Sequence, residues 1–459
     1  MNYTIENANE YISKNIETVN SKYRQKFHMM PPIGWMNDPN GLVKYNDEYH
    51  IFYQFYPYDS KWGPMHRGHF KSLDIIKYED LPVALSPEDQ SVESGCFSGG
   101  AIVKDDQLHL IYTRHYEVEG YKSETQYSAV SKDGINFEKG SLPVFDNQKL
   151  PKNIATNDFR DPNPICVNGT YYLFVGGKDI ERNLGVIVIL KSTDLKTFEY
   201  HFYIDHIYEM GDMGECPSYL KIGEYDILIF SGCNVKEKNN CYLNVNSNVA
   251  VICKIDFENK KFEQITVKEL DKGDAFYAAQ TIKHEDNILI GWLEMWGKDY
   301  LTDKLGHKWA GCLSIPRVLS LEGTTLLQNP IESIKNYYKR QYNPSNGDYI
   351  SNVCDLSFKA SKNFDFILKS QNQDLKLYAK DGYLYVDTSN SNNLVVKNIR
   401  RTDEAHDEFN IRMLLDVSSV EVFVNNGREV ISFRIYLDDN KYLLNSNNVY
   451  DIVVNEIEV

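Results

Sequence analysis

The chain carries five copies of one pattern, and this repeat limits the folds that it can adopt. Each copy has a small or polar start, a short apolar strand, a turn, and a second apolar or aromatic strand. Such a pattern is typical of a β-hairpin. The copies begin, at nearly even spacing, at Asp38, Ser98, Asp161, Glu215 and Tyr277.

A second, shorter element lies between successive hairpins and indicates an outer hairpin with its own turn. It reads SLDIIKYE from Ser72, SKDGINFE from Ser131, STDLKTFE from Ser192 and, more loosely, DFENKKFE from Asp256. Four strands per unit, repeated five times around an axis, predict a β-propeller. A sandwich of unrelated hairpins is the alternative, and the even spacing and the doubled pattern disfavour it.

The repeat and the change of composition after it predict the domains of an all-β chain. Residues 1–24 read as an N-terminal helical lead-in, and residues 25–336 as a five-bladed β-propeller catalytic domain. Residues 342–459 are rich in Asn and Ser and contain alternating strands, with a strong hairpin turn at Asn426-Gly427. We therefore expect a C-terminal β-sandwich domain there, without catalytic residues.

In a propeller the first strand of every unit lines the central channel, so the five starting residues converge at one end of it. Three of them are the carboxylic acids Asp38, Asp161 and Glu215. Because neighbouring negative charge raises a carboxyl pKa, we expect one of the three to stay protonated near neutral pH. A protonated acid beside an ionised one is the arrangement that glycosidases use. Calcium or magnesium binding is the competing interpretation, but the sequence has no EF-hand-like loop, and we expect no metal and no cofactor.

The net charge and the N-terminal sequence limit the kinds of molecule that the protein can be expected to bind and its expected location. The formal net charge is −16, which argues against nucleic acid or an anionic membrane and leaves a small-molecule substrate. The N-terminal stretch is polar and lacks the apolar core of a signal peptide, and no apolar run reaches transmembrane length, so we expect a cytoplasmic protein. Eight scattered cysteines without a C-x-x-C pair read as free thiols.

Several motifs together resemble glycoside hydrolase family 32, the β-fructofuranosidases, which include invertases, sucrose-6-phosphate hydrolases and fructan hydrolases. The similarity covers almost the whole chain, and the order WMNDPNG, FRDP, ECP is highly specific. The supporting stretches are HMMPPIGWMNDPNGL, FYQFYPYDSKWGPMH, CFSGGA, FRDP, ECP, FYAAQ, WAGCLSIPR and SSVEVFVNNGREVISFRIY.

The resemblance implies a five-bladed propeller followed by a β-sandwich, and a retaining mechanism with a fructosyl-enzyme intermediate. It implies that Asp38 is the nucleophile, Glu215 the general acid/base and Asp161 the transition-state stabiliser. By the same resemblance, the residues that contact the fructosyl unit are Asn37, Gln54, Trp62, Phe97, Ser98, Arg160, Tyr277 and Trp296.

One stretch departs from the family pattern. Family members commonly read WGPMHWGHA, whereas this chain reads WGPMHRGHF from Trp62 to Phe70. Arg67 stands where the family usually has tryptophan, on the leaving-group side. A phosphate there needs a cation, so Arg67 is a candidate phosphate contact, and Lys298, Lys304 and Lys308 are further candidates.

The expected substrate is therefore sucrose 6-phosphate or sucrose, and the sequence does not separate these from a short fructo-oligosaccharide. A non-catalytic sugar-binding propeller, an inverting arabinan-type glycosidase and a fructosyltransferase stay open as alternatives. The presence of all three acids disfavours the first, and the WMNDPNG and ECP contexts disfavour the second. The sequence does not indicate the oligomeric state.

Overall fold

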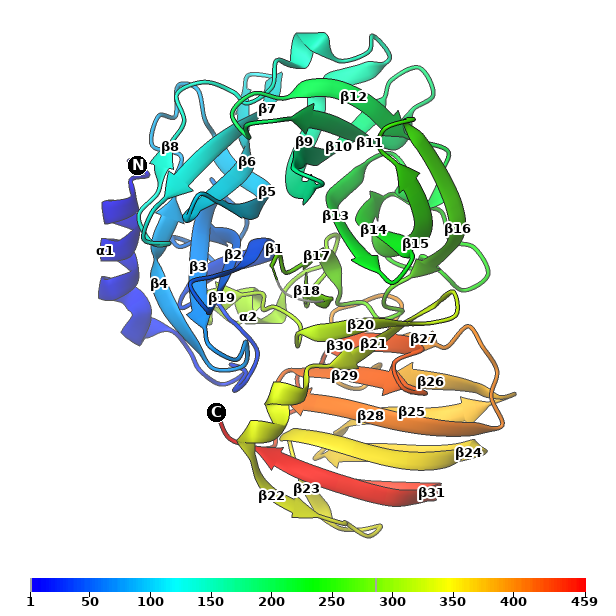
Figure 1. Ribbon diagram of the computed structural model, residues 1–459. Helices are drawn as coiled ribbons and strands as arrows, with labels where there is room; N and C mark the ends of the chain where they lie inside the picture. The colour runs from blue at the N-terminus through cyan, green and yellow to red at the C-terminus, as the bar shows by residue number, and fades with distance from the viewer. Residues whose placement is uncertain (1, 285–286) are drawn as a thin grey trace.

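The computed structural model describes residues 2–284 and 287–459 and contains five small sheets arranged around a central axis, with a larger β-structure against one side (Figure 1). Each small sheet is one blade of a β-propeller, so the predicted fold is confirmed. In chain order the blades are β1 (Gly34–Tyr45), β2 (Glu48–Tyr56), β3 (His66–Ser72) and β4 (Tyr78–Leu85); β5 (Gly95–Lys104), β6 (Gln107–Val118), β7 (Tyr121–Ser131) and β8 (Glu138–Lys139); β9 (Ile154–Val167), β10 (Thr170–Asp179), β11 (Leu184–Ser192) and β12 (Glu199–Ile204); β13 (Gly214–Ile222), β14 (Tyr225–Cys233), β15 (Asn246–Asp256) and β16 (Lys261–Glu269); and β17 (Tyr277–Thr281), β18 (Ile288–Trp292), β20 (Arg317–Glu322) and β21 (Thr325–Pro330).

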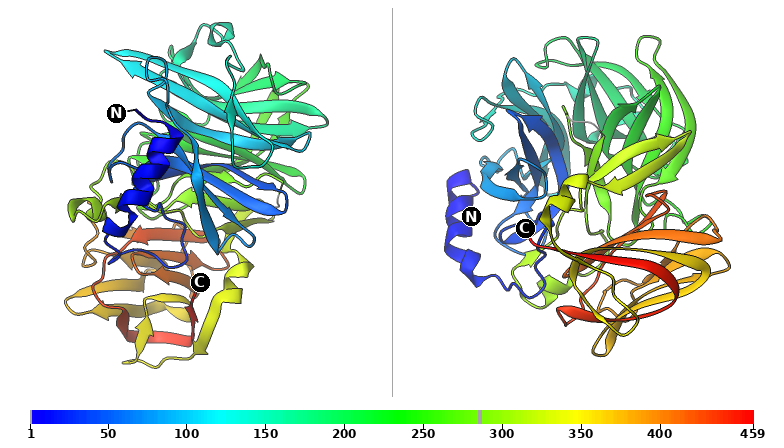
Figure 2. Two further views of the ribbon diagram at one scale, coloured as in Figure 1. Left: turned by 90° about the vertical axis from the view of Figure 1, so that its left-hand side faces the viewer. Right: turned by 60° about the horizontal axis from the view of Figure 1, so that its bottom comes forward.

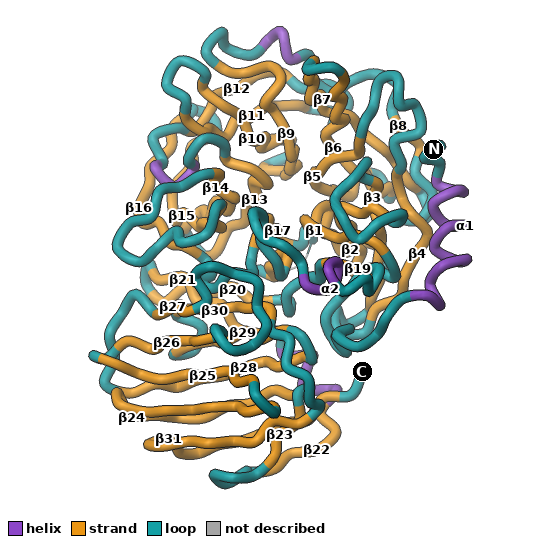
Figure 3. The backbone as a smooth tube through the Cα atoms, turned by 180° about the vertical axis from the view of Figure 1, so that it is seen from behind, coloured by secondary structure: helices purple, strands orange, loops and turns teal. Residues whose placement is uncertain are grey.

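The innermost strands β1, β5, β9, β13 and β17 contact one another in a ring around the axis (Figure 3). The ring closes where β17 contacts β1, and a short strand, β19 (Trp309–Ala310), pairs in parallel with the start of β1. The fifth predicted turn includes Glu285 and Asp286, which lie outside the described residues.

Each predicted starting residue lies at or beside an irregularity of an innermost strand, and this corrects the expectation that Asp38 begins its strand. Asp38 lies inside β1, between Met36 and Pro39, where the pairing with β2 shifts register. The other four innermost strands also shift register beside their predicted residue. A bulge disrupts the ladder and re-aims nearby side chains, and four of the five, those of Asp38, Ser98, Asp161 and Glu215, line one cavity at the axis.

The second sequence element forms the turn between the third and fourth strands of a blade. In the second and third blades the serine hydroxyl bonds to the aspartate two residues later, at 2.8 Å from Ser131 to Asp133 and 3.0 Å from Ser192 to Asp194. Both aspartates also accept backbone N–H groups of the turn. The predicted outer hairpins are therefore confirmed, and local side-chain hydrogen bonds explain their Ser-x-Asp pattern.

The N-terminal helix α1 (Ile5–Asn15) lies along the outer strand β4 of the first blade (Figure 2). Thr4 caps it by accepting a hydrogen bond from the Asn7 N–H, and Ala8 is the buried residue on its inner face. Asn9 accepts a hydrogen bond of 3.0 Å from the Val83 N–H, so the helix satisfies part of an open sheet edge. The remaining helical segments are η1 (Ile16–Thr18), η2 (Asn147–Lys149), η3 (Tyr208–Met210), α2 (Leu301–Lys304) and η4 (Glu332–Tyr337).

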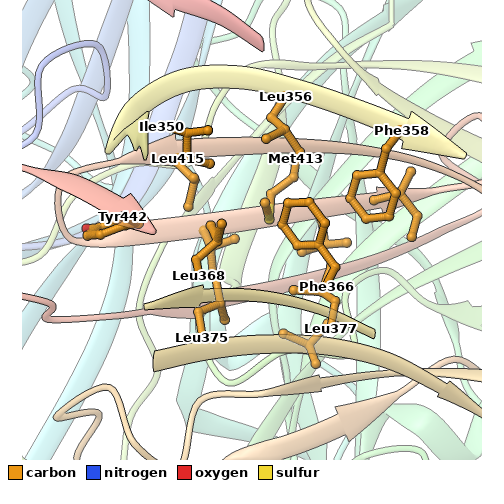
Figure 4. Packing of buried hydrophobic residues seen from close by; sticks show 14 of the residues in the cluster. Ile350, Leu356, Phe358, Phe366, Leu368, Leu375, Leu377, Met413, Leu415 and Tyr442 are labelled. Carbon is orange, nitrogen blue, oxygen red and sulfur yellow. The ribbon is translucent and has the colours of Figure 1, made fainter. Parts of the chain in front are cut away.

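The C-terminal part is a β-sandwich in which two layers enclose an apolar core (Figure 4). Leu356 and Phe358 on β24 pack in that core with Phe366, further along the same long strand, and with Met413 of β28. The strands are β22 (Tyr338–Tyr342), β23 (Tyr349–Ser351), β24 (Val353–Ser370), β25 (Gln373–Lys380), β26 (Tyr383–Asp387), β27 (Ile399–Arg401), β28 (Glu408–Asp416), β29 (Ser419–Val424), β30 (Glu429–Arg434) and β31 (Lys441–Ile457).

A buried ionic network joins the sandwich to the propeller. Arg317 of β20 contacts Glu421 of β29 at 2.5 Å and Asp271 at 2.9 Å, and all three side chains are fully buried. His28 bonds to Glu421 at 2.9 Å and to Asp416 at 2.8 Å. The network fixes the sandwich against the fifth blade, away from the propeller axis. Among the described residues no helix is long and apolar enough to cross a membrane.

Candidate active site

A cavity of about 290 Å³ opens where the innermost strands meet, and it contains the three predicted acids. Seven of the eight side chains predicted to contact the sugar also line it. The eighth, Tyr277, is buried directly behind Glu215. The lining residues are Asn37, Asp38, Gln54, Trp62, Phe97, Ser98, Arg160, Asp161, Glu215, Cys233, Asn246 and Trp296.

Asp38 is held by short hydrogen bonds from its neighbours. Its Oδ1 accepts from the Asn37 amide at 3.0 Å, and its Oδ2 accepts from the Ser98 hydroxyl at 3.0 Å. The Trp35 indole N–H in turn fixes Asn37 by donating to its Oδ1 at 2.7 Å. The Asp38 carboxylate is therefore oriented from two blades.

Asp161 faces Asp38 across a shared cysteine. Its Oδ2 accepts the Cys216 backbone N–H at 3.0 Å, and the Cys216 thiol lies 3.6 Å from Asp161 and 3.5 Å from Asp38. Asp161 has a φ of 64°, in the left-handed region that non-glycine residues seldom adopt. Its N–H donates to the Thr113 hydroxyl at 2.9 Å, and this contact supports the strained backbone.

Glu215 is bound on both oxygens. Arg160 donates to Oε1 from Nη2 at 2.7 Å and from Nε at 3.1 Å, and the Tyr277 hydroxyl donates to Oε2. The Glu215 side chain keeps 20% of its surface exposed. Arg160, predicted as a fructosyl contact, thus also holds Glu215 in the ligand-free protein.

The three carboxyls have unequal pKa values. Burial raises the pKa of Asp38 to about 6, and the charge of Glu215 acts in the same direction. Burial also raises the pKa of Asp161 to about 7, against the opposing charge of Arg160. For Glu215, burial acts upward, but the charge of Arg160 and the Tyr277 hydrogen bond hold the pKa below its ordinary value. These environments favour the proton on the aspartates, Asp161 above all, and the ionised form of Glu215 in the ligand-free protein.

The aromatic residues divide into cavity walls and core. Trp62 is 50% exposed and meets Phe97 edge-on, and Trp296 stacks on Trp35 with ring centroids 5.7 Å apart. Trp62, Phe97 and Trp296 therefore offer apolar faces to a sugar. Trp292 and Trp309 are fully buried packing residues.

Sequence reasoning missed a supporting group behind Arg160. Glu124 of β7 is 1% exposed and accepts from Arg160 Nη1 at 3.1 Å. His115, 3.4 Å from Glu124, stacks on Phe97 with ring centroids 4.0 Å apart. Burial opposes the Glu124 charge, but Arg160, His115 and Lys122 lower its pKa to about 2. The sequence analysis made no prediction for the strand that carries Glu124.

Asn246 and Cys233 were also missed. The Asn246 amide donates to the Tyr277 hydroxyl at 3.2 Å, and the Cys233 sulfur lies 3.7 Å from the same oxygen. Both residues lie at strand ends, where β14 stops and β15 begins, and no local motif distinguishes them. Among residues 2–284 and 287–459, no group of three His, Cys, Asp or Glu side chains has the geometry of a metal site.

Arg67 does not lie where a phosphate contact requires it. Its side chain is fully buried and lines neither the acid cavity nor the neighbouring one described below. Nη2 donates to the Phe97 carbonyl at 2.5 Å, the guanidinium lies over the Tyr112 ring, and burial lowers its pKa to about 10. The sequence-based expectation fails because β3 is sandwiched inside the blade, so its side chains pack between blades and do not face the axis.

The cavity at the propeller axis has aromatic walls, is large enough for a sugar, and contains three carboxyl groups. This arrangement is typical of a glycosidase. A model of the N-terminal domain of glycosyl hydrolases family 32 matches residues 28–330, and a model of the family's C-terminal domain matches residues 322–459. The chain belongs to glycoside hydrolase family 32 and is a β-fructofuranosidase, as the motifs predicted. This assignment favours the retaining over the inverting arabinan-type interpretation.

Individual relatives agree with the family. The sucrose-6-phosphate hydrolase of Escherichia coli is 34% identical over 456 residues, which cover 94% of this chain and 92% of that protein. A family 32 β-fructofuranosidase of Bombyx mori superimposes with a TM-score of 0.86 at 32% identity, covering 99% of this chain and 98% of the other, and a mutant of it has been solved with sucrose. A sucrose-6-phosphate hydrolase from Lactobacillus gasseri gives a TM-score of 0.89 at 26% identity, with 99% of both chains covered.

Proposed function

We propose that this enzyme hydrolyses sucrose 6-phosphate or sucrose with Asp38 as nucleophile, Glu215 as general acid/base and Asp161 as the group that binds sugar hydroxyls. The observation that carries the proposal is the unequal environment of the three acids. Asp38 is oriented by Asn37 and Ser98, while Glu215 faces it from another blade and is exposed to the cavity.

In the first step Asp38 attacks C2 of the fructofuranose ring, and the bond from C2 to the leaving-group oxygen breaks. That oxygen keeps the electron pair and takes the proton of Glu215. The products are an ester between fructose and Asp38, the free leaving-group sugar, and an ionised Glu215.

In the second step Glu215 removes a proton from water, and the water oxygen attacks C2. The bond from C2 to the Asp38 oxygen breaks, and the electron pair returns to the carboxylate. Two inversions at C2 give net retention, with Asp38 ionised and Glu215 protonated again.

The substrate has to move the proton within the acid cluster before the first step. In the ligand-free protein Arg160 stabilises the Glu215 carboxylate, and the proton resides on the aspartates. Sugar hydroxyls that donate to Asp161 favour its charged form, and sugar oxygens that accept from Arg160 weaken its hold on Glu215. Both changes transfer the proton to Glu215, where protonation of the leaving group needs it.

The phosphorylated substrate also suggests a location and a domain plan. The bacterial relatives named above are sucrose-6-phosphate hydrolases, and a sugar phosphate is retained inside cells, so we place the enzyme in the cytoplasm. We assign catalysis to residues 25–336 and a supporting role to the sandwich of residues 342–459, with residues 1–24 as a lead-in.

A substrate panel tests the proposal. Sucrose, sucrose 6-phosphate, raffinose, inulin and levan are compared by kcat/KM, with Asp38→Ala as the inactive control. We expect the highest value for sucrose or its 6-phosphate and low values for the polymers. A preference for inulin or levan, or activity that survives in folded Asp38→Ala, contradicts it.

A further inference from the structure

A second cavity, of about 600 Å³, lies beside the acid cavity, and Trp296 lines both. Its walls come from four places: the residues before β15, the segment between β16 and β17, the segment after β18, and the sandwich, through β27 and the loop before it. The lining residues are Leu243, Asn244, Val245, Asp274, Met295, Trp296, Gly297, Lys298, Asp299, Leu394, Val395, Val396, Lys397 and Arg400. The sandwich therefore contributes directly to the surroundings of the acid cavity.

Arg400 of β27 is the unusual residue of this second cavity. It is 3% exposed, and it donates from Nε to the Lys397 carbonyl at 3.0 Å and from Nη2 to the Asn244 side-chain oxygen at 2.5 Å. Within the described part of the chain, no carboxylate lies at ion-pair distance from it. The buried Arg160 and Arg317 each contact at least two carboxylates. Arg67 is also buried on a neutral partner, but it lines neither cavity.

The other charges of the second cavity are already compensated. Lys298 contacts Asp274 at 2.9 Å and Glu294 at 2.8 Å, and Lys397 contacts Glu237 at 2.5 Å. Asp299, the remaining acid of the lining, contacts Lys304 at 2.6 Å. Burial of a cation without a bonded counter-ion is unfavourable, and burial lowers the pKa of Arg400 although the charges of Asp274 and three more distant acids act in the opposite direction. An anion in the second cavity gives Arg400 a bonded counter-ion without displacing an existing ion-pair partner.

Short contacts connect Arg400 to the acid cavity. Asn244, which accepts from Arg400, precedes Asn246 by two residues, and Asn246 donates to Tyr277 at 3.2 Å. Tyr277 in turn donates to Glu215. This chain of contacts runs behind Glu215, and in front of it Trp296 lines both cavities, so a leaving group that extends from the acid cavity past Trp296 enters the second cavity.

We propose that the second cavity binds an anionic substituent of the leaving group, a phosphate monoester on the sugar, with Arg400 as its principal contact and Trp296 as the wall between the two cavities. This inference rests on the proposed function and specifies its substrate. The sandwich then takes part in selecting the substrate, because Arg400 would supply the phosphate contact that Arg67 does not.

The experiment compares Arg400→Gln and Arg400→Lys with Arg401→Gln as a matched control. The neighbouring Arg401 stacks on Tyr383 and lines neither cavity. The readout is the ratio of kcat/KM for sucrose 6-phosphate to that for sucrose. We expect Arg400→Gln to lower this ratio about 10- to 100-fold, Arg400→Lys to lower it less, and Arg401→Gln to leave it unchanged.

Product inhibition of the wild-type enzyme tests the site even if a variant fails to fold. Glucose 6-phosphate should inhibit at least about tenfold more strongly than glucose, and inorganic phosphate should weaken that inhibition. Equal inhibition by both sugars, or an unchanged ratio in folded Arg400→Gln, overturns the inference. Sucrose hydrolysis that depends on Asp38 would still stand in that case, whereas its absence overturns the proposed function itself.

Discussion

Two clusters in this protein combine arginine with carboxylates, and they differ in what the carboxylates can reach. At the interface of propeller and sandwich, Arg317, Asp271 and Glu421 are all fully buried and bonded to one another. In the acid cavity, Arg160 pairs with Glu215, which is 20% exposed, while Asp38 and Asp161 form no ion pair with an arginine of the described residues and have raised pKa values. Carboxylates that are fully buried and paired with arginine therefore join the two domains. Carboxyls that face a cavity without such a partner can react with a ligand.

The largest expected effect concerns Asp38. Asp38→Asn removes the proposed nucleophile but keeps the shape of the side chain, so kcat should fall by roughly 10⁴-fold or more. The free energy of unfolding should not decrease, because the substitution removes a buried charge that Glu215 repels. Kinetics on sucrose together with denaturant unfolding check both parts. A folded variant that retains kcat within tenfold contradicts the role of Asp38.

Paired substitutions of the two arginines test the comparison itself. Arg317→Met leaves Asp271 and Glu421 buried without their cation and should reduce the free energy of unfolding by about 3–5 kcal/mol. Arg160→Met should cost less stability, because Glu215 faces the cavity and Glu124 keeps Lys122 at 3.1 Å, but it should lower kcat/KM strongly. Urea unfolding and kinetics on the same samples separate the effects. Equal losses of unfolding free energy in Arg317→Met and Arg160→Met would contradict the proposed difference between the interface cluster and the acid cavity.

The interface should respond to pH through His28. Burial opposes its charge, but Asp416 and Glu421 raise its pKa to about 9, from 6.5 in the unfolded chain. Its stabilising contribution is thus complete below pH 6.5 and is lost as the pH rises through 9, by about 3 kcal/mol in total. The measurement is the difference in unfolding free energy between the wild type and His28→Gln from pH 6 to pH 10. A difference that does not change with pH contradicts this assignment.

The acid cavity should respond over a different pH range and in activity. Below a pKa of about 6 Asp38 is protonated and cannot attack, and above about 7 the cluster loses the proton that Glu215 must donate. A plot of kcat/KM against pH should therefore be a narrow bell, with midpoints near these two values. If the acid side of the profile has its midpoint near pH 4, as for an ordinary aspartate, then burial does not raise the pKa of Asp38 in the active enzyme.

The repeat in the sequence predicted much of this comparison, and tertiary packing determined the rest. Spacing placed Asp38, Asp161 and Glu215 at one end of the axis, because equivalent residues of a propeller converge. The bulges were not predictable, since they arise from pairing with the second strand of each blade. The burial of Arg67 was also missed. The prediction used only the motif around Arg67, whereas its side chain is buried against Phe97 of the second blade.

The proton distribution was predicted only in outline. Mutual repulsion indicated one protonated acid, but the identity of that acid depends on Arg160 and on Glu124 behind it, which lie on different strands. Arg400 belongs to another domain, far along the chain from the acids, so its position beside Asn244 follows from the packing of sandwich on propeller.

The most direct test of the central claim is to trap the fructosyl-enzyme. In Glu215→Gln, an activated fructoside needs no acid for the first step, while the second step lacks its base, so the intermediate should accumulate. Mass spectrometry of the quenched protein should show the addition of one fructosyl residue, located on the peptide that contains Asp38. A folded Glu215→Gln enzyme that releases the activated leaving group in a burst, yet carries no adduct or carries it on another residue, would contradict the account.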